Sequence, residues 1–244
     1  MKQLYGMLYN DLVKRRYRRI RNGKDELVVM APLVGKRYET HQDVRLMWVG
    51  RAVNGWTPVD LCEGEAAFLS KVFDESTQED RYHFLWETYS DKRAGPYYLA
   101  SSFWRVSKLV CEKLFLPPDE DGLWAEHLVW ANLYAAAPSG GNPGKTLCDA
   151  QRSVCRDILL RQIELARPTH LVFVTGWDWF DEFNGAEPKR LFAEAREPVS
   201  TEGPVVWCGQ ADNMRIAVTE RPEFRYGDQC FADAVCSALE SLSV

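Results

Sequence analysis

The residues of this chain best suited to chemistry on a ligand are side-chain amides and cations that follow apolar segments. Asn132 comes after the apolar run Leu128–Ala131, and a stretch rich in Gly and Pro then leads to Asn142 and Lys145. A carboxamide offers both a donor and an acceptor, so Asn132 can read the edge of a neutral heterocyclic ring. Lys145 stands beside the backbone N–H groups at the start of a predicted helix, which suits a phosphate group.

A second loop follows another apolar run and ends at Trp56. It begins at Gly50 and contains the pair Asn54-Gly55, which permits positive φ and lets the backbone approach a ligand closely. The amide of Asn54 can orient a water molecule. Trp56 can stack on a planar ring or can equally belong to the core, and both interpretations stay open.

A third loop follows the predicted strand at 214–219 and carries two arginines, Arg221 and Arg225. A guanidinium is always charged and can stabilise a developing anion or bind a phosphate. Both arginines are therefore candidates for binding an anionic group, and Arg225 can contact a phosphate.

Three common kinds of catalytic site are not indicated by the sequence. Gly144-Lys145-Thr146 resembles the end of a P-loop, but three residues separate Gly140 from Gly144 where that motif needs four. No Gly-x-Ser-x-Gly nucleophile elbow is present. The four histidines show no metal-ligand spacing, so no metal is expected.

The elements that must position these loops alternate between apolar strands and amphipathic helices. This alternation predicts an α/β fold with a mainly parallel sheet, whose ligand site lies at the carboxyl ends of the strands. Helices are expected at about 2–20, within 51–74, and at 99–115, 146–166, 177–184 and 228–241, with strands at 45–50, 128–134, 170–175, 205–208 and 214–219.

Length and composition are those of a soluble globular protein. The chain of 244 residues suits one large α/β domain, and its hydrophobic share of 46% is enough to bury a sizeable core. No apolar run approaches the roughly 20 residues that span a bilayer, and the N-terminus lacks an apolar signal segment. Seven cysteines without tight pairing favour reduced thiols. We therefore expect a cytoplasmic protein with no membrane partner.

The charge is distributed unevenly along the chain. The net charge is −5, but residues 1–24 carry +7, which leaves −12 for the remainder. At helical spacing, basic residues share one face of the N-terminal segment, opposite an apolar face formed by Tyr5, Tyr9, Leu12, Val13 and Ile20. This segment either contacts phosphates or is a docked helix whose basic face pairs with the acidic body.

The order of features around Asn132 resembles the uracil-DNA glycosylase superfamily, especially its iron–sulfur and thermophile-type branches. After Asn132 come a turn with Pro138, Gly141 and Asn142, a helix ending in Gln-x-x-x-x-Arg-Pro at 162–168, and an apolar strand ending at Gly176. The resemblance covers about residues 45–240 and is most specific over 128–176. It implies a three-layer α/β/α sandwich with an about four-stranded, mainly parallel central sheet. The domain would span 45–244, preceded by a basic helix and irregular extension at 1–44.

The resemblance also implies roles for the loop residues. Asn132 would read a base flipped out of single-stranded or damaged DNA, with Gly50, Trp56 and Asn142 lining the base site. Asn54 would position the water that attacks the sugar anomeric carbon, since no acid lies between Gly50 and Trp56. Arg221 holds the position where the family carries a histidine, and would stabilise the departing base.

Cysteine spacing argues against the iron–sulfur cluster of those branches. Cys155 fits one ligand position, but Ala136 occupies another and the first 61 residues contain no cysteine. Four thiolates are required for such a cluster, so neither a cluster nor another cofactor is expected. The other six cysteines are predicted to be buried small apolar residues, namely Cys62, Cys111, Cys148, Cys208, Cys230 and Cys236.

Three functions remain open from the sequence. The first is a DNA glycosylase that hydrolyses an N-glycosidic bond. The second is a catalytically inactive nucleic-acid- or nucleotide-binding module on the same fold, favoured by the missing acid and the missing histidine. The third is an unrelated enzyme built on a common α/β unit, because fold does not determine function.

Overall fold

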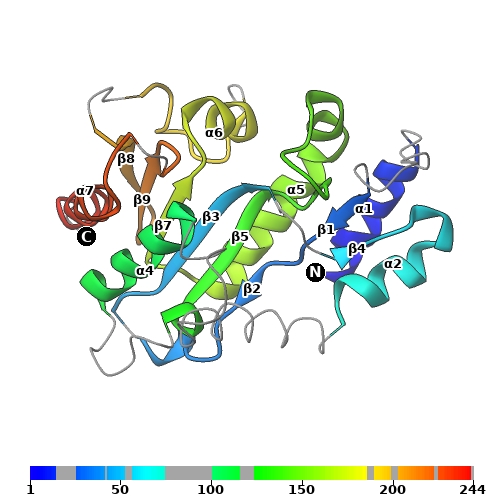
Figure 1. The fold of residues 1–244 in the computed structure, drawn as a ribbon, viewed down its shortest axis with the longest axis horizontal. Coiled ribbons are helices and arrows are strands. Elements are labelled where there is room, and N and C mark those ends of the chain that lie inside the picture. The colour runs from blue at the N-terminus through cyan, green and yellow to red at the C-terminus, as the bar shows by residue number, and fades with distance from the viewer. Residues whose placement is uncertain are drawn as a thin grey trace. The chain divides into compact units, whose positions relative to one another are not determined.

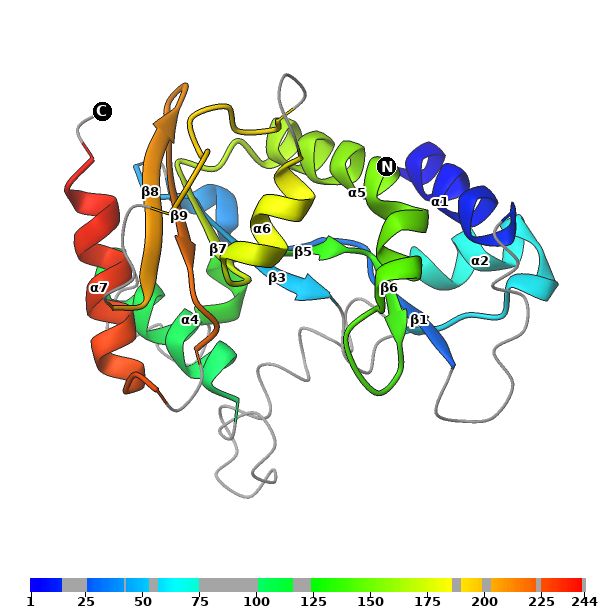
Figure 2. The same ribbon diagram turned by 90° about the horizontal axis from the view of Figure 1, so that it is seen from above.

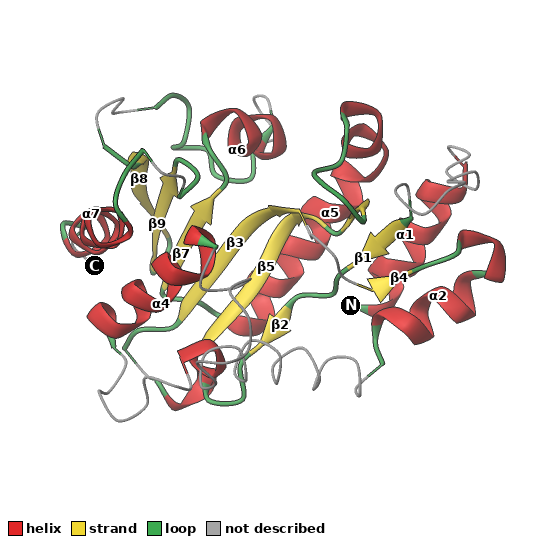
Figure 3. Ribbon diagram, viewed as in Figure 1, coloured by secondary structure: helices red, strands yellow, loops and turns green. Residues whose placement is uncertain are grey.

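The computed structural model describes residues 1–14, 26–41, 43–52, 57–74, 101–115, 124–185, 190–198, 203–222 and 225–242. These residues form a mixed α/β fold with six α-helices and two β-sheets (Figure 1, Figure 3). The chain divides into two compact units. Unit 1 comprises Met1–Leu33, Gly50–Glu79 and Ala131–Ala166, and unit 2 comprises Val34–Val49, Asp80–Trp130 and Arg167–Val244. The predicted boundary at residue 44, between an N-terminal extension at 1–44 and a domain at 45–244, stays a prediction.

The larger sheet has six strands among the described residues, in the order β2-β5-β3-β7-β9-β8. Strands β3, β7 and β9 pair in parallel, and β8 pairs antiparallel with β9. Their bounds are β2 Leu33–Val34, β3 Leu46–Ala52, β5 Leu128–Tyr134, β7 His170–Val174, β8 Val205–Ala211 and β9 Met214–Thr219.

The four strands expected at 45–50, 128–134, 170–175 and 214–219 all belong to this sheet, as predicted. The expected strand number of about four is too low, because β2 and β8 extend the sheet. All five residues of β7 are buried, as are the first four of β3 and of β5. Strands that are buried on both faces consist of consecutive apolar residues. The sequence therefore predicted these three strands from their apolar runs.

Unit 1 contains the smaller sheet, which is antiparallel and has the order β4-β1-β6. Helix α1 contacts both α2 and α5 in this unit (Figure 2). The bounds are α1 Lys2–Lys14, β1 Leu27–Val29, β4 Thr57–Pro58, α2 Glu65–Val72, β6 Ala136–Pro138 and α5 Lys145–Ala166, with a 3-10 turn at Leu61–Glu63.

Helix α1 docks through its apolar face. Tyr5, Leu8 and Leu12 are fully buried, whereas Tyr9 and Val13 are half-buried. The Tyr9 hydroxyl donates to the Leu61 carbonyl at 3.1 Å. The described part of the N-terminal segment is therefore a packed helix, and the rest of the predicted helix and its arginines lie outside the described residues.

Unit 2 places helices on both sides of its part of the sheet. Helices α4 and α7 contact each other, and Figure 2 shows α7 and α6 on opposite sides of the β7, β9 and β8 strands. The bounds are α4 Ser102–Leu114, α6 Trp177–Asn184 and α7 Asp228–Glu240, with a 3-10 turn at Tyr38–Thr40. The carboxyl ends of two neighbouring strands are joined where the Gly176 amide donates to the Thr219 carbonyl at 2.8 Å.

The prediction that all six remaining cysteines are buried is wrong for three of them. Cys62 and Cys230 are exposed and Cys208 is half-buried, while Cys111, Cys148 and Cys236 are buried. Cys62 lies in a turn in which Leu61 takes the buried place, and Cys230 precedes the buried Phe231 of α7. Cys208 belongs to β8, the last strand of the sheet, which is covered less than the inner strands.

None of the helices in the described part of the chain is both long enough and apolar enough to cross a membrane.

Candidate functional site

Asn132 is the fifth residue of β5 and lies inside the strand, two residues before its end. Its side chain is half-buried, and Nδ2 donates to the Met30 Sδ at 3.0 Å. The Tyr5 hydroxyl donates to the Met30 carbonyl at 2.6 Å, and the Met30 amide donates to the Ala135 carbonyl at 3.0 Å. The partner of the Asn132 amide is therefore itself fixed by backbone hydrogen bonds.

A small cavity lies beside Asn132 within unit 1. Its volume is about 10 Å³, which is enough for about one water molecule. The cavity is lined by Tyr5, Met30, Pro32, Asn132, Leu133, Ala135, Cys155 and Ile158.

The segment after Asn132 is held by the buried side chain of Gln151 on α5. Its Nε2 donates to the Ala136 carbonyl at 2.7 Å, and its Oε1 accepts from the Ala136 amide at 2.9 Å. The neighbouring Cys155 Sγ accepts from the Ala135 amide at 3.4 Å. Gln151 was not among the predicted site residues. A glutamine on the apolar face of a helix, four residues before Cys155, is the sequence signal that could have identified it.

Burial keeps the Cys155 thiol protonated. Desolvation raises its pKa to about 12, partly offset by the hydrogen bond from the Ala135 amide. A thiol with this pKa is a poor metal ligand, since metals bind the thiolate. No group of three or more His, Cys, Asp or Glu side chains within the described ranges is arranged to hold a metal ion.

Gly50 is buried and is the fifth residue of β3, the strand next to β5 in the sheet order. Gly50 and Asn132 both belong to unit 1, so two of the predicted residues lie on neighbouring strands of one unit. Asn54 and Trp56, the predicted water-positioning and ring-stacking residues, lie outside the described residues.

Asn142 and Lys145 are exposed at the start of α5. The Lys145 Nζ lies 3.3 Å from the Asp149 Oδ2, and Arg152 Nη2 lies 2.8 Å from the Asp149 Oδ1. The Lys145 side chain is 76% exposed, so its ion pair is weak and the ammonium stays accessible to an anion.

Arg221 and Arg225 are exposed in the connection from β9 to α7 in unit 2. Pro222, next to Arg221, is buried. The Arg225 guanidinium lies over the ring of Tyr226, with its Cζ 5.4 Å from the ring centroid. This pair places an exposed cation against a half-buried aromatic ring just before α7, and Tyr226 was not predicted.

The predicted residues therefore fall into two groups. Unit 1 holds Gly50, Asn132, Asn142 and Lys145, and unit 2 holds Arg221 and Arg225. The catalytic pair predicted from the sequence is not tested, because Asn54 lies outside the described residues.

No protein-family model matches this chain, and no curated protein is significantly similar to it.

Proposed function

We propose that this chain binds single-stranded nucleic acid on a scaffold like that of the uracil-DNA glycosylases, without excising a base. The observation that carries the proposal is the exposed connection after β9, with Arg221, Arg225 and the Tyr226 ring beneath Arg225. Cations interleaved with aromatic rings are typical of single-strand binding, because the cations contact phosphates and the rings stack with bases. Strand carboxyl ends are also where open α/β sheets place their ligands.

The cavity beside Asn132 favours binding over excision. A glycosylase must hold a whole base outside the stack while water attacks the sugar, and the cavity that Asn132 lines is small, about 10 Å³. One of the two N–H donors of the Asn132 amide is also engaged by Met30. The scaffold that we propose is a three-layer α/β/α sandwich.

Fluorescence anisotropy with a labelled single strand of roughly ten nucleotides tests the binding, since this length matches common single-strand sites. We expect the logarithm of the affinity to fall linearly with the logarithm of salt concentration. Arg221→Ala and Arg225→Ala should each reduce that slope by about 0.7, the contribution of one phosphate contact on a single strand.

Arg161→Ala is the matched control, because Arg161 is exposed on α5 and pairs with Glu164 at 2.9 Å. It removes the same charge from another surface and should leave the slope unchanged. An equal effect of all three variants would indicate a response to net charge and would contradict the proposed interface.

A uracil-containing strand tests the second candidate, base excision, which the resemblance around Asn132 favours. Release of free uracil would overturn binding without excision and would restore the roles expected for Asn54 and Arg221. In that case Asn132→Asp should lower discrimination between bases at least about tenfold, because it replaces an amide donor with a carboxylate. An unchanged discrimination with a lowered melting temperature would leave Asn132 with a structural role only.

A further inference from the structure

Trp177 is the first residue of α6 and follows the end of β7 after Thr175 and Gly176. Its ring is half-buried and packs on Phe180, with 5.6 Å between the ring centroids. Phe180 is buried and lies 5.0 Å from Phe173 and 6.3 Å from Phe192 by centroid. Trp177 is thus the outermost ring of an aromatic column that begins in the core of unit 2.

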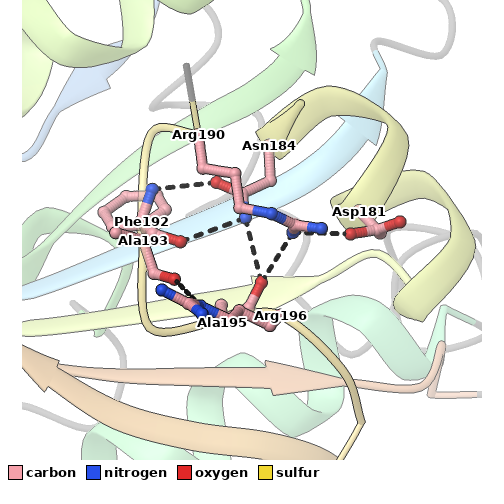
Figure 4. Close-up of polar contacts among 7 residues, drawn as sticks. All are labelled: Asp181, Asn184, Arg190, Phe192, Ala193, Ala195 and Arg196. Atoms are coloured by element: carbon pink, nitrogen blue, oxygen red, sulfur yellow. Dashed lines mark hydrogen bonds and ion pairs between the residues drawn. The ribbon is translucent and has the colours of Figure 1, made fainter. Parts of the chain in front are cut away.

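The inner end of this column is fixed by a polar clamp at the end of α6 (Figure 4). The buried side chain of Asn184 accepts from the Phe192 amide at 2.8 Å and donates to the Phe192 carbonyl at 3.2 Å. It also donates to the Ala195 carbonyl at 3.2 Å. Both main-chain polar groups of Phe192 are therefore bound by Asn184, which fixes the backbone from which its ring packs on Phe180.

Arg190 binds both α6 and the segment that follows Phe192. Its Nη1 donates to the Asp181 Oδ1 and to the Ala195 carbonyl, each at 2.8 Å (Figure 4). The Arg190 side chain is 14% exposed, so this ion pair is shielded from water better than most surface pairs. The loop over Phe192 is therefore tied to α6, and a ring resting on this column has a rigid support.

Trp177 and Arg221 follow the carboxyl ends of two neighbouring strands, β7 and β9. Val174 is paired with Thr219, and the Gly176 amide donates to the Thr219 carbonyl. Trp177 is one residue beyond Gly176 and Arg221 is two residues beyond Thr219, so their backbones start from neighbouring strand ends, about 5 Å apart. The exposed Asp178 and half-buried Glu220 lie on the same segments, and their charges oppose binding by phosphate contacts alone.

We propose that Trp177 is a stacking platform for one base of a single strand, with Arg221 taking the phosphate beside it. The inference rests on the proposed function and adds a residue that binds the base. Stacking does not depend on charge, so it supplies affinity where Asp178 and Glu220 weaken phosphate binding. The packing of Trp177 on the buried Phe180 restricts the ring before binding, which reduces the entropy lost on binding.

The test compares two probes that carry the same number of phosphates, an oligothymidylate of roughly ten nucleotides and an abasic strand of equal length. The wild-type chain should bind the oligothymidylate more tightly. Trp177→Ala should weaken that binding about tenfold, within the range for loss of one stacked base, and should leave abasic binding unchanged. Trp177→Phe keeps an aromatic face and should restore most of the affinity.

Trp179→Ala is the matched control, because Trp179 is also half-buried on α6 but lies two residues further and faces another side of the helix. Its oligothymidylate affinity should stay unchanged. Melting temperatures of both variants identify any loss due to unfolding, and the Phe variant keeps the test valid if Trp177→Ala fails to fold.

Equal wild-type affinity for both probes would overturn the stacking platform while leaving phosphate-based binding intact. An equal loss on both probes for Trp177→Ala would also overturn it. Absence of binding to either probe would overturn the proposed function together with this inference.

Discussion

At the scale of single residues, two buried polar side chains each bind both main-chain polar groups of one residue in another segment. Gln151 pairs with both polar groups of Ala136, and Asn184 does the same for Phe192. A buried N–H or carbonyl without a partner is costly, so these side-chain hydrogen bonds stabilise the main chain that they bind. These two side chains therefore hold the segments that follow β5 and α6.

Replacing Gln151 with Leu should lower the free energy of unfolding by about 2–4 kcal/mol, because both polar groups of Ala136 lose their partner while the side-chain volume is nearly kept. Denaturant unfolding measures the change. Ser153→Ala, at an exposed position of the same helix, should change stability by no more than about 0.5 kcal/mol. A similar small change for Gln151→Leu would contradict the role of this pair.

His170 should make the folded state sensitive to acid. Burial, and then the nearby Arg215, lower the pKa of His170 to about 4, against about 6.5 in an unfolded chain. The unfolded chain thus takes up this proton at higher pH than the folded chain. The stability that His170 contributes is therefore complete above about pH 6.5 and is lost as the pH falls toward 4.

This loss should reach up to about 3 kcal/mol between pH 6.5 and pH 4. His170→Asn keeps a polar atom near Nδ1, which lies 2.9 Å from the Thr169 Oγ1, but it does not titrate. Unfolding free energies of both proteins across this range should therefore show a shallower pH dependence for the variant. Parallel curves would show that other groups cause the acid sensitivity.

At the scale of elements, the sheet edge at β2 depends on a close approach of two backbone segments. The Gly35 amide donates to the Leu128 carbonyl at 3.0 Å, and the Arg37 amide donates to the Glu126 carbonyl at 2.9 Å. A Cβ at Gly35 would lie 2.0 Å from the Glu126 carbonyl oxygen. Backbone atoms cannot move aside as a flexible side chain can, so this position requires glycine.

Gly35→Ala should lower the free energy of unfolding by about 2–3 kcal/mol, the usual cost of forcing an extra methyl group into a packed site. Gly140→Ala is the control, because a Cβ at Gly140 meets no atom within 4 Å. Denaturant unfolding of both variants should separate them clearly. An unchanged Gly35→Ala protein would show that the edge segment shifts without cost.

The elements that the sequence predicted and those it did not differ in what stabilises them. Strands such as β7 can be predicted from a run of apolar residues, and long helices such as α5 from apolar residues at helical spacing. The three residues Ala136–Pro138 of β6 carry no such pattern, and they form a strand because β1 pairs with them and Gln151 binds Ala136. Tertiary hydrogen bonds of this kind have no local signal in a sequence.

At the scale of the whole molecule, the sequence indicated which loops follow strands but not what surrounds each side chain. Asn132 was placed on the right strand, yet its contact with Met30 joins residues 102 positions apart. The aromatic column under Trp177 likewise depends on Phe192, which follows α6 in the sequence and packs on Phe180. Such neighbours depend on the path of the chain, which periodicity does not reveal.

The distribution of charge over the whole chain leads to the last prediction. Residues 15–24 contain six basic residues and no acidic one, whereas the chain as a whole is acidic. These residues lie outside the described ranges, so their contribution must be measured in solution. If they contact phosphates, they supply long-range attraction that the acidic remainder opposes, and binding should depend on them more at low salt.

Replacing Arg15, Arg16, Arg18 and Arg19 with Ala should reduce the salt slope of single-strand affinity by up to about 3, since each phosphate contact contributes about 0.7. The control removes four exposed and scattered basic residues instead, namely Lys36, Lys113, Arg161 and Arg196. Both variants have the same net charge, so a general response to charge would change both slopes equally. A reduced slope in the first variant alone assigns the N-terminal segment to the nucleic acid. An unchanged slope with a lowered melting temperature assigns its basic face to the acidic body of the protein.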